Sequence, residues 1–419
     1  MNSLCLDTRG GDLLPSVPRG PRARLRARAA AALFRRAVAR LPVRVEFPDG
    51  TILGAGADAQ PLPRMIIRDP DSLFARIGSQ GLIGFGESYT AGDWTAPDPA
   101  AVLTAFAREV DRLIPPALQG LRRVLLPSPP ERDRGTVADA QANIAHHYDL
   151  SNEMFLLFLD RTMTYSSALF TDVAAASWEA LAAAQCRKID RLLDAAGVGA
   201  GSRVLEIGTG WGELCVRAAA RGAVVHSVTL SRRQLELARL RVAAAGYADG
   251  VHIELLDYRE VRGEYDAIVS VEMIEAVGYR QWPTYFARLD ARLAPGGRIA
   301  LQAITMPHER MLATRHTHTW IQKYIFPGGF LPSTEAVETA AARTRLRVRE
   351  RFCFGPHYAE TLRLWRERFD TRAPELEALG FDGTFRRIWQ FYLAYSEAGF
   401  RSGYLDVQQI VLDRPEEHP

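Results

Sequence analysis

The residues best suited to chemistry lie at 204–212, Val-Leu-Glu-Ile-Gly-Thr-Gly-Trp-Gly, where an apolar run meets a glycine turn and a helical pattern follows. Glycines at such a turn allow tight backbone turning and close approach of a ligand. Glu206 comes before the first glycine and can accept hydrogen bonds from a cofactor that carries a cationic amino acid. Together with Gly208 and Gly210, it indicates S-adenosylmethionine and therefore methyl transfer.

A dinucleotide site and a turn without any ligand are the alternatives for this loop. A dinucleotide site has the pattern G-x-G-x-x-G and an acidic residue about 20 positions further on. Here the third glycine comes one residue early, at Gly212, and the second predicted strand ends at 226–230 without an acid. Both features argue against a nicotinamide dinucleotide, whereas this segment alone leaves the ligand-free turn open.

The elements that must position these residues alternate between strands and helices. We predict strands at 203–207, 224–230, 252–256, 267–271 and 298–304, and helices at 213–220, 231–244 and 281–293. This alternation predicts an α/β fold with a doubly wound, parallel sheet. Ligands of such sheets bind beyond the carboxyl ends of the strands. The polar residues at or near those ends are Glu206, Thr229, Asp257, Glu275 and Gln302.

Asp257 and Tyr258 follow the third predicted strand and suit an adenine pocket. The carboxylate can accept from the exocyclic amine, and the ring can contact the base. Taken singly, Tyr258 fits a packing role equally well.

Composition and charge limit the class of protein. The chain has 419 residues and a formal net charge of +3, so it is not a polyelectrolyte, and we expect no nucleic-acid partner. Its cysteines, at 5, 186, 215 and 353, form no CxxC pair, which suits a reducing cytoplasm and predicts no metal site. No apolar run approaches the ~20 residues that span a bilayer.

The N-terminal region concentrates basic charge in a helical pattern over 21–41. Its arginines are Arg19, Arg22, Arg24, Arg26, Arg28, Arg35, Arg36 and Arg40. One interpretation is a helix packed on its own domain with solvated arginines, and the other is a basic amphipathic helix resting on anionic lipid. The whole chain divides into a predicted disordered tail at 1–20, an N-terminal domain at 21–126, a Pro-rich linker at 127–140 and a catalytic domain at 141–419.

Several long motifs, in order, resemble the cyclopropane-fatty-acyl-phospholipid synthase family. They are the segments 147–155, 159–170, 270–278, 321–333 and 357–362, and the glycine-aromatic stretch at 82–94 resembles the N-terminal domain of the family. Within it, the segments 82–92, 270–278, 306–332 and 393–406 look most like the actinobacterial methyltransferases of 10-methylstearate (tuberculostearate) synthesis. The resemblance implies a seven-stranded, mostly parallel, Rossmann-like sheet of the class I methyltransferases, with a smaller N-terminal α+β domain.

The resemblance implies methylation of the cis double bond of an oleoyl-type phospholipid acyl chain. Methyl transfer to the alkene leaves a carbocation, which a bound base deprotonates. A hydride shift before proton loss gives a methylene branch, which a separate flavin- or nicotinamide-dependent reductase can saturate; direct closure gives a cyclopropane. A methyltransferase of a soluble small molecule and a non-catalytic lipid-binding subunit are the competing hypotheses.

The resemblance also implies site residues. Bicarbonate is the expected base, in a cradle made by the backbone near Ser167, the carboxylate of Glu275, the segment from Gln302 to Ile304 and the hydroxyl of Tyr358. Two positions depart from the family pattern: Ser167 replaces a cysteine and Gln302 replaces a histidine. The implied cofactor-binding residues are Tyr165, Ser166, Gly208, Gly210, Thr229, Leu230, Gln234, Asp257 and Tyr258, and aromatics within 321–330 are expected in an acyl tunnel.

A phospholipid substrate strengthens the membrane interpretation of the N-terminal arginines, because the enzyme must reach a bilayer surface. Each arginine near an anionic leaflet strengthens the free energy of membrane binding by about 1 kcal/mol. We therefore expect a cytoplasmic, homodimeric enzyme that binds peripherally to the inner face of the cell membrane.

Overall fold

The computed structural model describes residues 14–55, 62–109 and 151–415. The chain forms two compact units, and each is built from separate stretches of sequence. Unit 1 comprises Met1–Pro129, His316–Ile325 and Arg366–Tyr404, and unit 2 comprises Pro130–Arg315, Phe326–Trp365 and Leu405–Pro419. The sequence predicted one continuous domain over 141–419, whereas two inner stretches of that range pack with unit 1. The predicted linker, the motif at 147–150 and residues 1–13 of the predicted tail lie outside the described residues.

Unit 1 combines a small sheet with helices. The strands pair in the order β2-β1-β3-β4, with β1 parallel to β3 and the other pairs antiparallel. Asp69 and Asp98 cap two of its helices, each followed by a proline at the first helical position. Its elements are α1 (Pro21–Val38), β1 (Arg44–Glu46), β2 (Ile52–Leu53), β3 (Arg64–Ile67), α2 (Pro70–Gln80), α3 (Leu82–Ala91), β4 (Trp94–Thr95), α4 (Pro99–Arg108), α16 (Trp320–Tyr324), α19 (Ala373–Ala378) and α20 (Gly383–Arg401).

The glycine-aromatic stretch forms α3 and the start of β4, and its aromatic rings make a packed cluster within unit 1. Phe85 stacks on Trp94 with ring centroids 4.9 Å apart. A Cβ at Gly86 would lie 2.5 Å from the ring of Trp320, so only glycine allows α16 to approach this closely. These aromatic rings therefore pack in the core of unit 1. The segment 321–330, in which aromatics were predicted to line an acyl tunnel, belongs to unit 1 up to residue 325 and to unit 2 beyond it.

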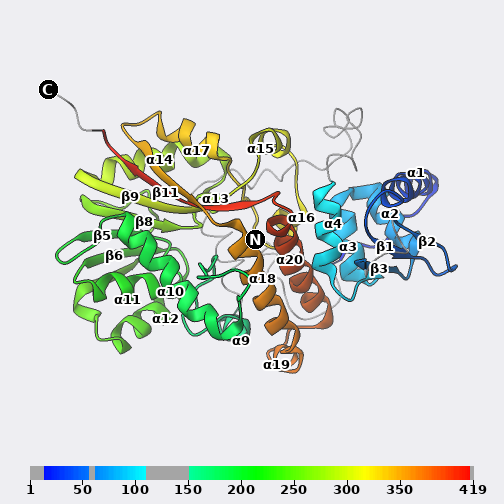
Figure 1. Cartoon of the computed structure of the whole chain (residues 1–419), viewed down its shortest axis with the longest axis horizontal. Helices are drawn as coiled ribbons and strands as arrows, with labels where there is room; N and C mark the ends of the chain where they lie inside the picture. Colours follow the sequence, from blue (N-terminus) through cyan, green and yellow to red (C-terminus); the bar gives the residue numbers. More distant parts are fainter. Residues whose placement is uncertain (1–13, 56–61, 110–150, 416–419) are drawn as a thin grey trace. The chain divides into compact units, whose positions relative to one another are not determined.

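Unit 2 contains a seven-stranded sheet in the order β10-β11-β9-β8-β5-β6-β7, in which β11 alone runs antiparallel to its neighbours (Figure 1). Its elements are α9 (Asn152–Phe158), α10 (Trp178–Ala195), β5 (Arg203–Ile207), α11 (Glu213–Ala220), β6 (Val224–Thr229), α12 (Arg232–Ala244), β7 (Val251–Leu255), β8 (Tyr265–Val271), α13 (Ile274–Val277), α14 (Trp282–Arg292), β9 (Leu293–Thr305), α15 (His308–Thr314), α17 (Thr334–Ala341), β10 (Arg347–Cys353) and β11 (Asp406–Asp413). Helix α18 (Gly355–Asp370) begins in unit 2 and ends in unit 1. The predicted fold class is confirmed.

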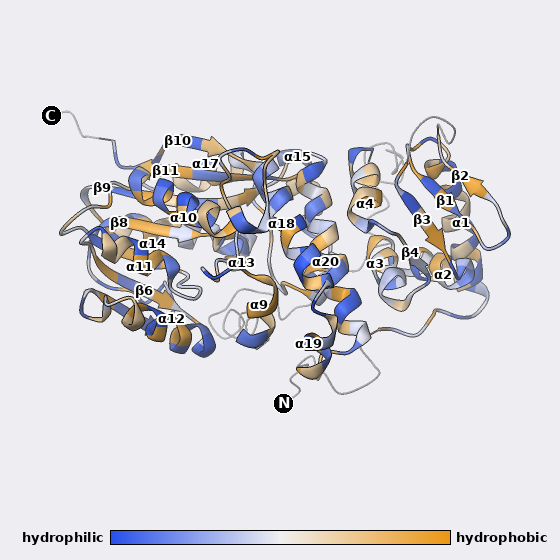
Figure 2. Cartoon of the chain, turned by 60° about the horizontal axis from the view of Figure 1, so that its bottom comes forward, coloured by the Kyte–Doolittle hydropathy of each residue, from blue (hydrophilic) through white to orange (hydrophobic). Residues whose placement is uncertain are grey.

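Alternate residues along each strand face opposite cores, which is why helices cover both faces of the sheet. Val204 packs with α10, α11 and α12, whereas Leu205 and Ile207 pack with α14 and α17. Figure 1 shows these two helix layers on either side of the strands, and Figure 2 shows the apolar character of β6 and β8 between them. The chain runs outward from β5 to β7 and then returns to β8, so the strand order reverses between β5 and β8. Ligands bind at such a reversal in open α/β sheets.

None of the helices within the described residues combines the length and the apolar character that are needed to cross a membrane.

Candidate active site

A pocket lies in unit 2 where β5, β6 and β8 end, at the reversal of strand order. The structure brings to it every predicted cofactor-binding residue except Asp257. The lining residues that carry polar side chains or belong to the glycine loop include Tyr165, Ser166, Lys188, Glu206, Gly208, Gly210, Thr229, Gln234, Tyr258 and Glu272. The predicted cofactor residues therefore share one pocket, and Lys188 and Glu272, which the sequence analysis did not assign, share it with them.

The three glycines of the loop have different reasons to be glycine. All three have positive φ, at 96° for Gly208, 52° for Gly210 and 89° for Gly212. A Cβ at Gly208 would lie 2.6 Å from Cγ of Met273, and one at Gly212 would lie 3.2 Å from Ala238 of α12. A Cβ at Gly210 would meet no described atom within 4 Å. Two glycines thus close the turn against the protein, and the third leaves space on the pocket side.

Glu206 is buried at the end of β5 and is held by its own chain. Its Oε2 accepts hydrogen bonds from Sγ of Cys215 at 2.8 Å and from Oγ of Ser227 at 2.6 Å. Burial raises the pKa of Glu206 to about 7, against the opposing effect of these donors. A carboxylate with few donors in a buried pocket suits a cationic ligand, because the positive charge of the ligand stabilises its ionised form.

The end of β6 is connected to the start of α12. Oγ1 of Thr229 donates to Oε1 of Gln234 at 3.0 Å, and Ser231 caps the helix by accepting from the backbone N–H of Gln234 at 3.3 Å. These contacts fix Thr229 and Gln234 at the pocket wall beside Leu230. The structure therefore gives the predicted residues of this segment defined positions.

Asp257 and Tyr258 differ in how well they suit a ligand. Both carboxylate oxygens of Asp257 accept from Arg259, Oδ1 from Nε at 2.8 Å and Oδ2 from Nη2 at 2.7 Å, and this side chain is not part of the pocket lining. The buried hydroxyl of Tyr258 has no hydrogen-bond partner among the described residues. Burial raises the pKa of Tyr258 to about 12, so the group is a neutral donor. A direct role of Asp257 in binding adenine stays a prediction.

Tyr165 and Ser166 lie on the segment that precedes α10, and residues of that helix hold Ser166. Gln185 donates through Nε2 to the carbonyl oxygen of Ser166 at 2.8 Å, and Nζ of Lys188 donates to Oγ of Ser166 at 2.6 Å. Burial lowers the pKa of Lys188 to about 8, and the negative charge of Glu272 opposes that shift. Lys188 is one of only two lysines in a chain whose lysines and arginines number 52, and this could have drawn attention to it in the sequence.

Three of the predicted cradle groups meet on one carboxylate, that of Glu272 at the end of β8. Oε1 accepts from the backbone N–H of Ser167 at 3.1 Å and from Nε2 of Gln302 at 2.8 Å. Oε2 accepts from the hydroxyl of Tyr358 at 2.7 Å. Burial raises the pKa of Glu272, whereas Lys188 and the three donors lower it. Glu272 lies within the 270–278 motif, and the sequence predicted no role for it.

The backbone at Glu272 is strained, with φ of 52°. Glycine adopts this conformation freely, whereas a residue with a side chain pays about 1–3 kcal/mol. Such outliers persist where the surrounding structure holds them, often at functional sites.

The other two predicted cradle residues bind each other. The backbone N–H of Ile304 donates to Oε1 of Glu275 at 2.5 Å. Oε2 of Glu275 is buried and has no hydrogen-bond partner among the described residues. Burial, followed by the negative charge of Glu272, raises the pKa of Glu275 to about 8. The raised pKa favours the protonated form of Glu275 at neutral pH. The neighbouring carboxylate, that of Glu272, accepts three hydrogen bonds.

Residues from distant parts of unit 2 orient these donors. Nε2 of Gln409 donates to Oε1 of Gln302 at 3.2 Å, which directs the Gln302 amide nitrogen toward Glu272. Thr361 accepts from the backbone N–H of Ala168 at 3.1 Å and so holds the segment that presents the N–H of Ser167. Nothing in the sequence predicted a role for Gln409 or Thr361, because their relation to the site depends on the pairing of β11 with β9 and on the position of α18.

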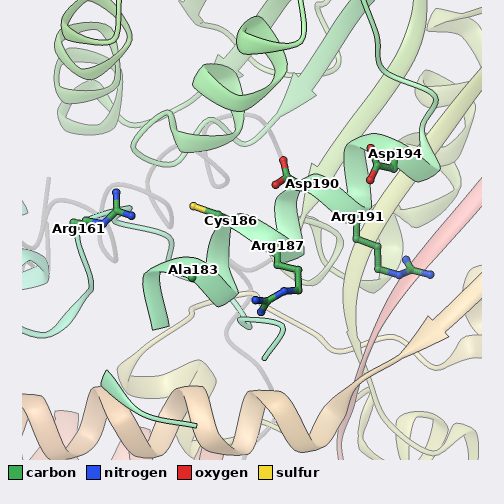
Figure 3. Close-up of a pocket in the computed structure, with 7 residues that line it drawn as sticks. All are labelled: Arg161, Ala183, Cys186, Arg187, Asp190, Arg191 and Asp194. Carbon is green, nitrogen blue, oxygen red and sulfur yellow. The ribbon is translucent and has the colours of Figure 1, made fainter. Parts of the chain in front are cut away.

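Two other polar features of unit 2 lie away from this pocket. Figure 3 shows a hollow lined by Arg161, Ala183, Cys186, Arg187, Asp190, Arg191 and Asp194, mostly from α10. Three of its charged side chains form ion pairs: Asp190 with Arg217 and Arg221, Asp194 with Arg221, and Arg191 with Glu350. His226, His252 and Glu254 form a cluster on β6 and β7, but both ring nitrogens of His226 are engaged, by Tyr265 and Glu254. Neither feature contains a predicted site residue.

The doubly wound sheet and the glycine-loop pocket at its reversal define an S-adenosylmethionine-dependent methyltransferase. The sequence matches the family described as mycolic acid cyclopropane synthetase over residues 136–410. It is 58% identical to tuberculostearic acid methyltransferase UfaA1 of Mycobacterium tuberculosis, across 98% of this chain and 97% of that protein. The chain belongs to the mycolic acid cyclopropane synthetase family.

Solved structures agree with this assignment. The cyclopropane synthase MmaA2 from Mycobacterium tuberculosis is 33% identical, with a TM-score of 0.60 over 65% of this chain and 97% of that one. Mycolic acid cyclopropane synthase CmaA1, complexed with SAH and CTAB, is 31% identical, with a TM-score of 0.59 over the same shares. The predicted family and the predicted cofactor, S-adenosylmethionine, are confirmed.

Proposed function

We propose that the protein methylates the cis double bond of an oleoyl-type acyl chain in a membrane phospholipid and releases a 10-methylene-branched chain, the precursor of 10-methylstearate. The observation that carries this proposal is the 58% identity to a tuberculostearic acid methyltransferase across nearly the whole chain. A saturated product requires a further two-electron reduction, so a separate flavin- or nicotinamide-dependent reductase is the expected partner. Cyclopropane formation is the second candidate, supported by the similarity to MmaA2 and CmaA1.

The residues of the pocket fit the cofactor, and they have two roles: some bind the cofactor and others hold the base. S-Adenosylmethionine supplies the electrophilic methyl group when it is bound. The glycine loop leaves room beside Gly210, and Glu206 offers a carboxylate that a positive charge stabilises. The unpartnered hydroxyl of Tyr258 is a donor for a polar atom of the ligand. Methylation of the alkene leaves a cation on the acyl chain, and a base at the Ser167, Gln302 and Tyr358 side of the pocket must take a proton from it. Bicarbonate, implied by the family resemblance, is one candidate for that base.

Helix α1 in unit 1 supports binding to an anionic membrane surface. Arg22, Arg24, Arg26 and Arg28 are exposed along it. Leu25 is 71% exposed and Leu33 is 47% exposed, so apolar side chains accompany the charges. This combination favours peripheral binding at the inner face of the cell membrane.

The membrane proposal is tested by sedimentation with neutral and anionic vesicles. We expect binding to anionic vesicles, and we expect replacement of Arg22, Arg24, Arg26 and Arg28 by Gln to weaken it by about 1 kcal/mol per arginine. Equal binding of the wild-type protein to both kinds of vesicle would contradict the electrostatic mechanism. Homodimerisation stays a prediction.

The reaction itself is tested by mass spectrometry of lipids from a host that expresses the protein and is fed methyl-labelled methionine. The expected product is an acyl chain heavier by one labelled methylene unit, with an exocyclic double bond. A cyclopropane ring would refute the methylene product. Folded protein that binds the cofactor but labels no acyl chain would refute the proposed function.

A further inference from the structure

The carboxylate of Glu272 occupies the point where the predicted base-binding groups converge. The N–H of Ser167, the amide of Gln302 and the hydroxyl of Tyr358 all donate to it, at 3.1, 2.8 and 2.7 Å. The family resemblance alone implies that each of these groups holds a bound bicarbonate. A carboxylate and a bicarbonate present the same planar pair of oxygens, so one set of donors serves either anion.

We propose that Glu272 is the catalytic base of this enzyme and takes the place of a bound bicarbonate ion. This inference rests on the proposed function. The carboxylate lines the same pocket as Gly208 and Gly210, so it lies on the wall of the cofactor site. Ser167, Gln302 and Tyr358 are buried, whereas Glu272 is only partly buried, and it is the member of this group that lines the pocket.

The two oxygens of Glu272 have different roles. Oε1 accepts from two donors, the backbone N–H of Ser167 and Nε2 of Gln302. Among the described residues Oε2 accepts one hydrogen bond, from the hydroxyl of Tyr358, and keeps a lone pair for a proton. After the hydride shift, a C–H bond of the new methyl group breaks and its electron pair closes the exocyclic double bond. The proton goes to Oε2, and the cation is neutralised.

The donors also explain why the base is not alkylated by the cation. Hydrogen bonds to both oxygens stabilise the anion and hold it in place, which lowers its nucleophilicity while it can still accept a proton. The strained backbone of Glu272, at φ of 52°, is consistent with this role, because glycine would fit there without strain and yet a glutamate is present. Replacement by glycine should therefore preserve the backbone and free the three donors.

The test uses the full chain and two substitutions, Glu272→Gln and Glu272→Gly, with Glu254→Gln as a control on β7, away from the pocket. Methyl transfer from labelled S-adenosylmethionine to vesicles of dioleoyl phospholipid is measured in buffer depleted of carbon dioxide and again with added bicarbonate. We expect wild-type and Glu254→Gln turnover to be independent of bicarbonate. Both Glu272 variants should lose about 10²–10⁴-fold in turnover, as loss of a general base does. Added bicarbonate should restore turnover at least tenfold in Glu272→Gly and leave Glu272→Gln inactive.

Direct binding supplies a readout that does not depend on turnover. Carbon-13-labelled bicarbonate should broaden its NMR line with Glu272→Gly and not with the wild-type protein. Isothermal titration with S-adenosylmethionine shows whether each variant keeps a folded pocket. Wild-type turnover that requires bicarbonate, or bicarbonate binding that is the same in wild type and Glu272→Gly, would overturn the role of Glu272. A wild-type protein that methylates no lipid would refute the proposed function, and the binding comparison would still decide whether Glu272 takes the position of the ion.

Discussion

The pocket has two sides that are built in different ways. On the cofactor side, one loop forms part of the wall, and the glycines at 208, 210 and 212 give that loop its shape within five residues of sequence. On the base side, Glu272 is held by groups from positions 167, 302 and 358, which come from three separate parts of unit 2. The difference suggests that cofactor binding depends on local backbone geometry, whereas proton transfer depends on long-range contacts that can change separately.

The same contrast appears between the two glutamates of the base side. Glu272 has three donors and the nearby charge of Lys188, which favour the anion. Glu275 accepts from one donor, its other oxygen has no partner among the described residues, and burial raises its pKa to about 8. Burial raises the pKa of both carboxyl groups. At Glu272 the three donors and Lys188 oppose that rise, whereas at Glu275 the negative charge of Glu272 adds to it, so the two groups differ in how strongly their surroundings favour the anion.

The largest effect on the cofactor side is expected from Gly208→Ala. The new Cβ meets Met273 at 2.6 Å and φ is 96°, so the loop must leave its shape or bind the cofactor under strain. We expect affinity for S-adenosylmethionine to fall about 30-fold, which corresponds to about 2 kcal/mol. Isothermal titration measures it. Gly246→Ala is the matched control, since φ there is 84° with no described atom within 4 Å of the added Cβ. A similar loss of affinity in both variants would show that general backbone strain, and not the pocket wall, is responsible.

A smaller effect is expected on the base side from Tyr358→Phe. This change removes the donor to Oε2 of Glu272, and hydrogen bonds to charged groups contribute about 1.5–3 kcal/mol. We expect turnover to fall about tenfold while affinity for S-adenosylmethionine is kept. Because that hydroxyl lowers the pKa of Glu272, its loss should move the acid limb of the pH–rate profile to higher pH. Tyr247→Phe serves as the control. An unchanged acid limb would separate Tyr358 from the titration of the base.

A separate effect concerns the stability of the fold and the raised pKa of Glu275. The folded state binds the Glu275 proton more tightly than the unfolded state does, so this group makes the free energy of unfolding fall as the pH rises from about 4.5 to about 8. In Glu275→Gln the free energy of unfolding should fall less steeply with pH, by up to about 1.4 kcal/mol per pH unit. Urea unfolding of both proteins at pH 5 and pH 8 measures the change. Identical slopes would mean that Glu275 ionises freely in the folded protein.

The two sides also differ in how far the sequence predicts them. Strand β5 and helix α11 match their predicted bounds, because glycines and neighbouring apolar runs follow local rules, and the loop between them lines the pocket. Family motifs predicted the residues of the base-binding cradle but not how those residues pair. Glu275 accepts from Ile304, whereas Ser167, Gln302 and Tyr358 donate to Glu272. Strands β10 and β11 were not predicted from pattern, since Gln408 and Gln409 interrupt the apolar run of β11. These buried glutamines have partners that only the folded sheet supplies.

The domain boundaries show the same limit. A Pro-rich segment indicates a linker from sequence alone, but nothing local indicates that 316–325 and 366–404 pack with unit 1. Those assignments depend on contacts between residues far apart in the chain, such as Tyr324 with Glu87 at 2.8 Å.

The separation of the two sides is tested most directly by measuring S-adenosylmethionine affinity and single-turnover methyl transfer on the same preparation of Glu272→Gln. We predict affinity within about threefold of wild type and a methyl-transfer product that forms at least 10²-fold more slowly. A variant that transfers methyl groups at the wild-type rate, or one that loses cofactor binding and turnover together, would contradict an independent base at Glu272.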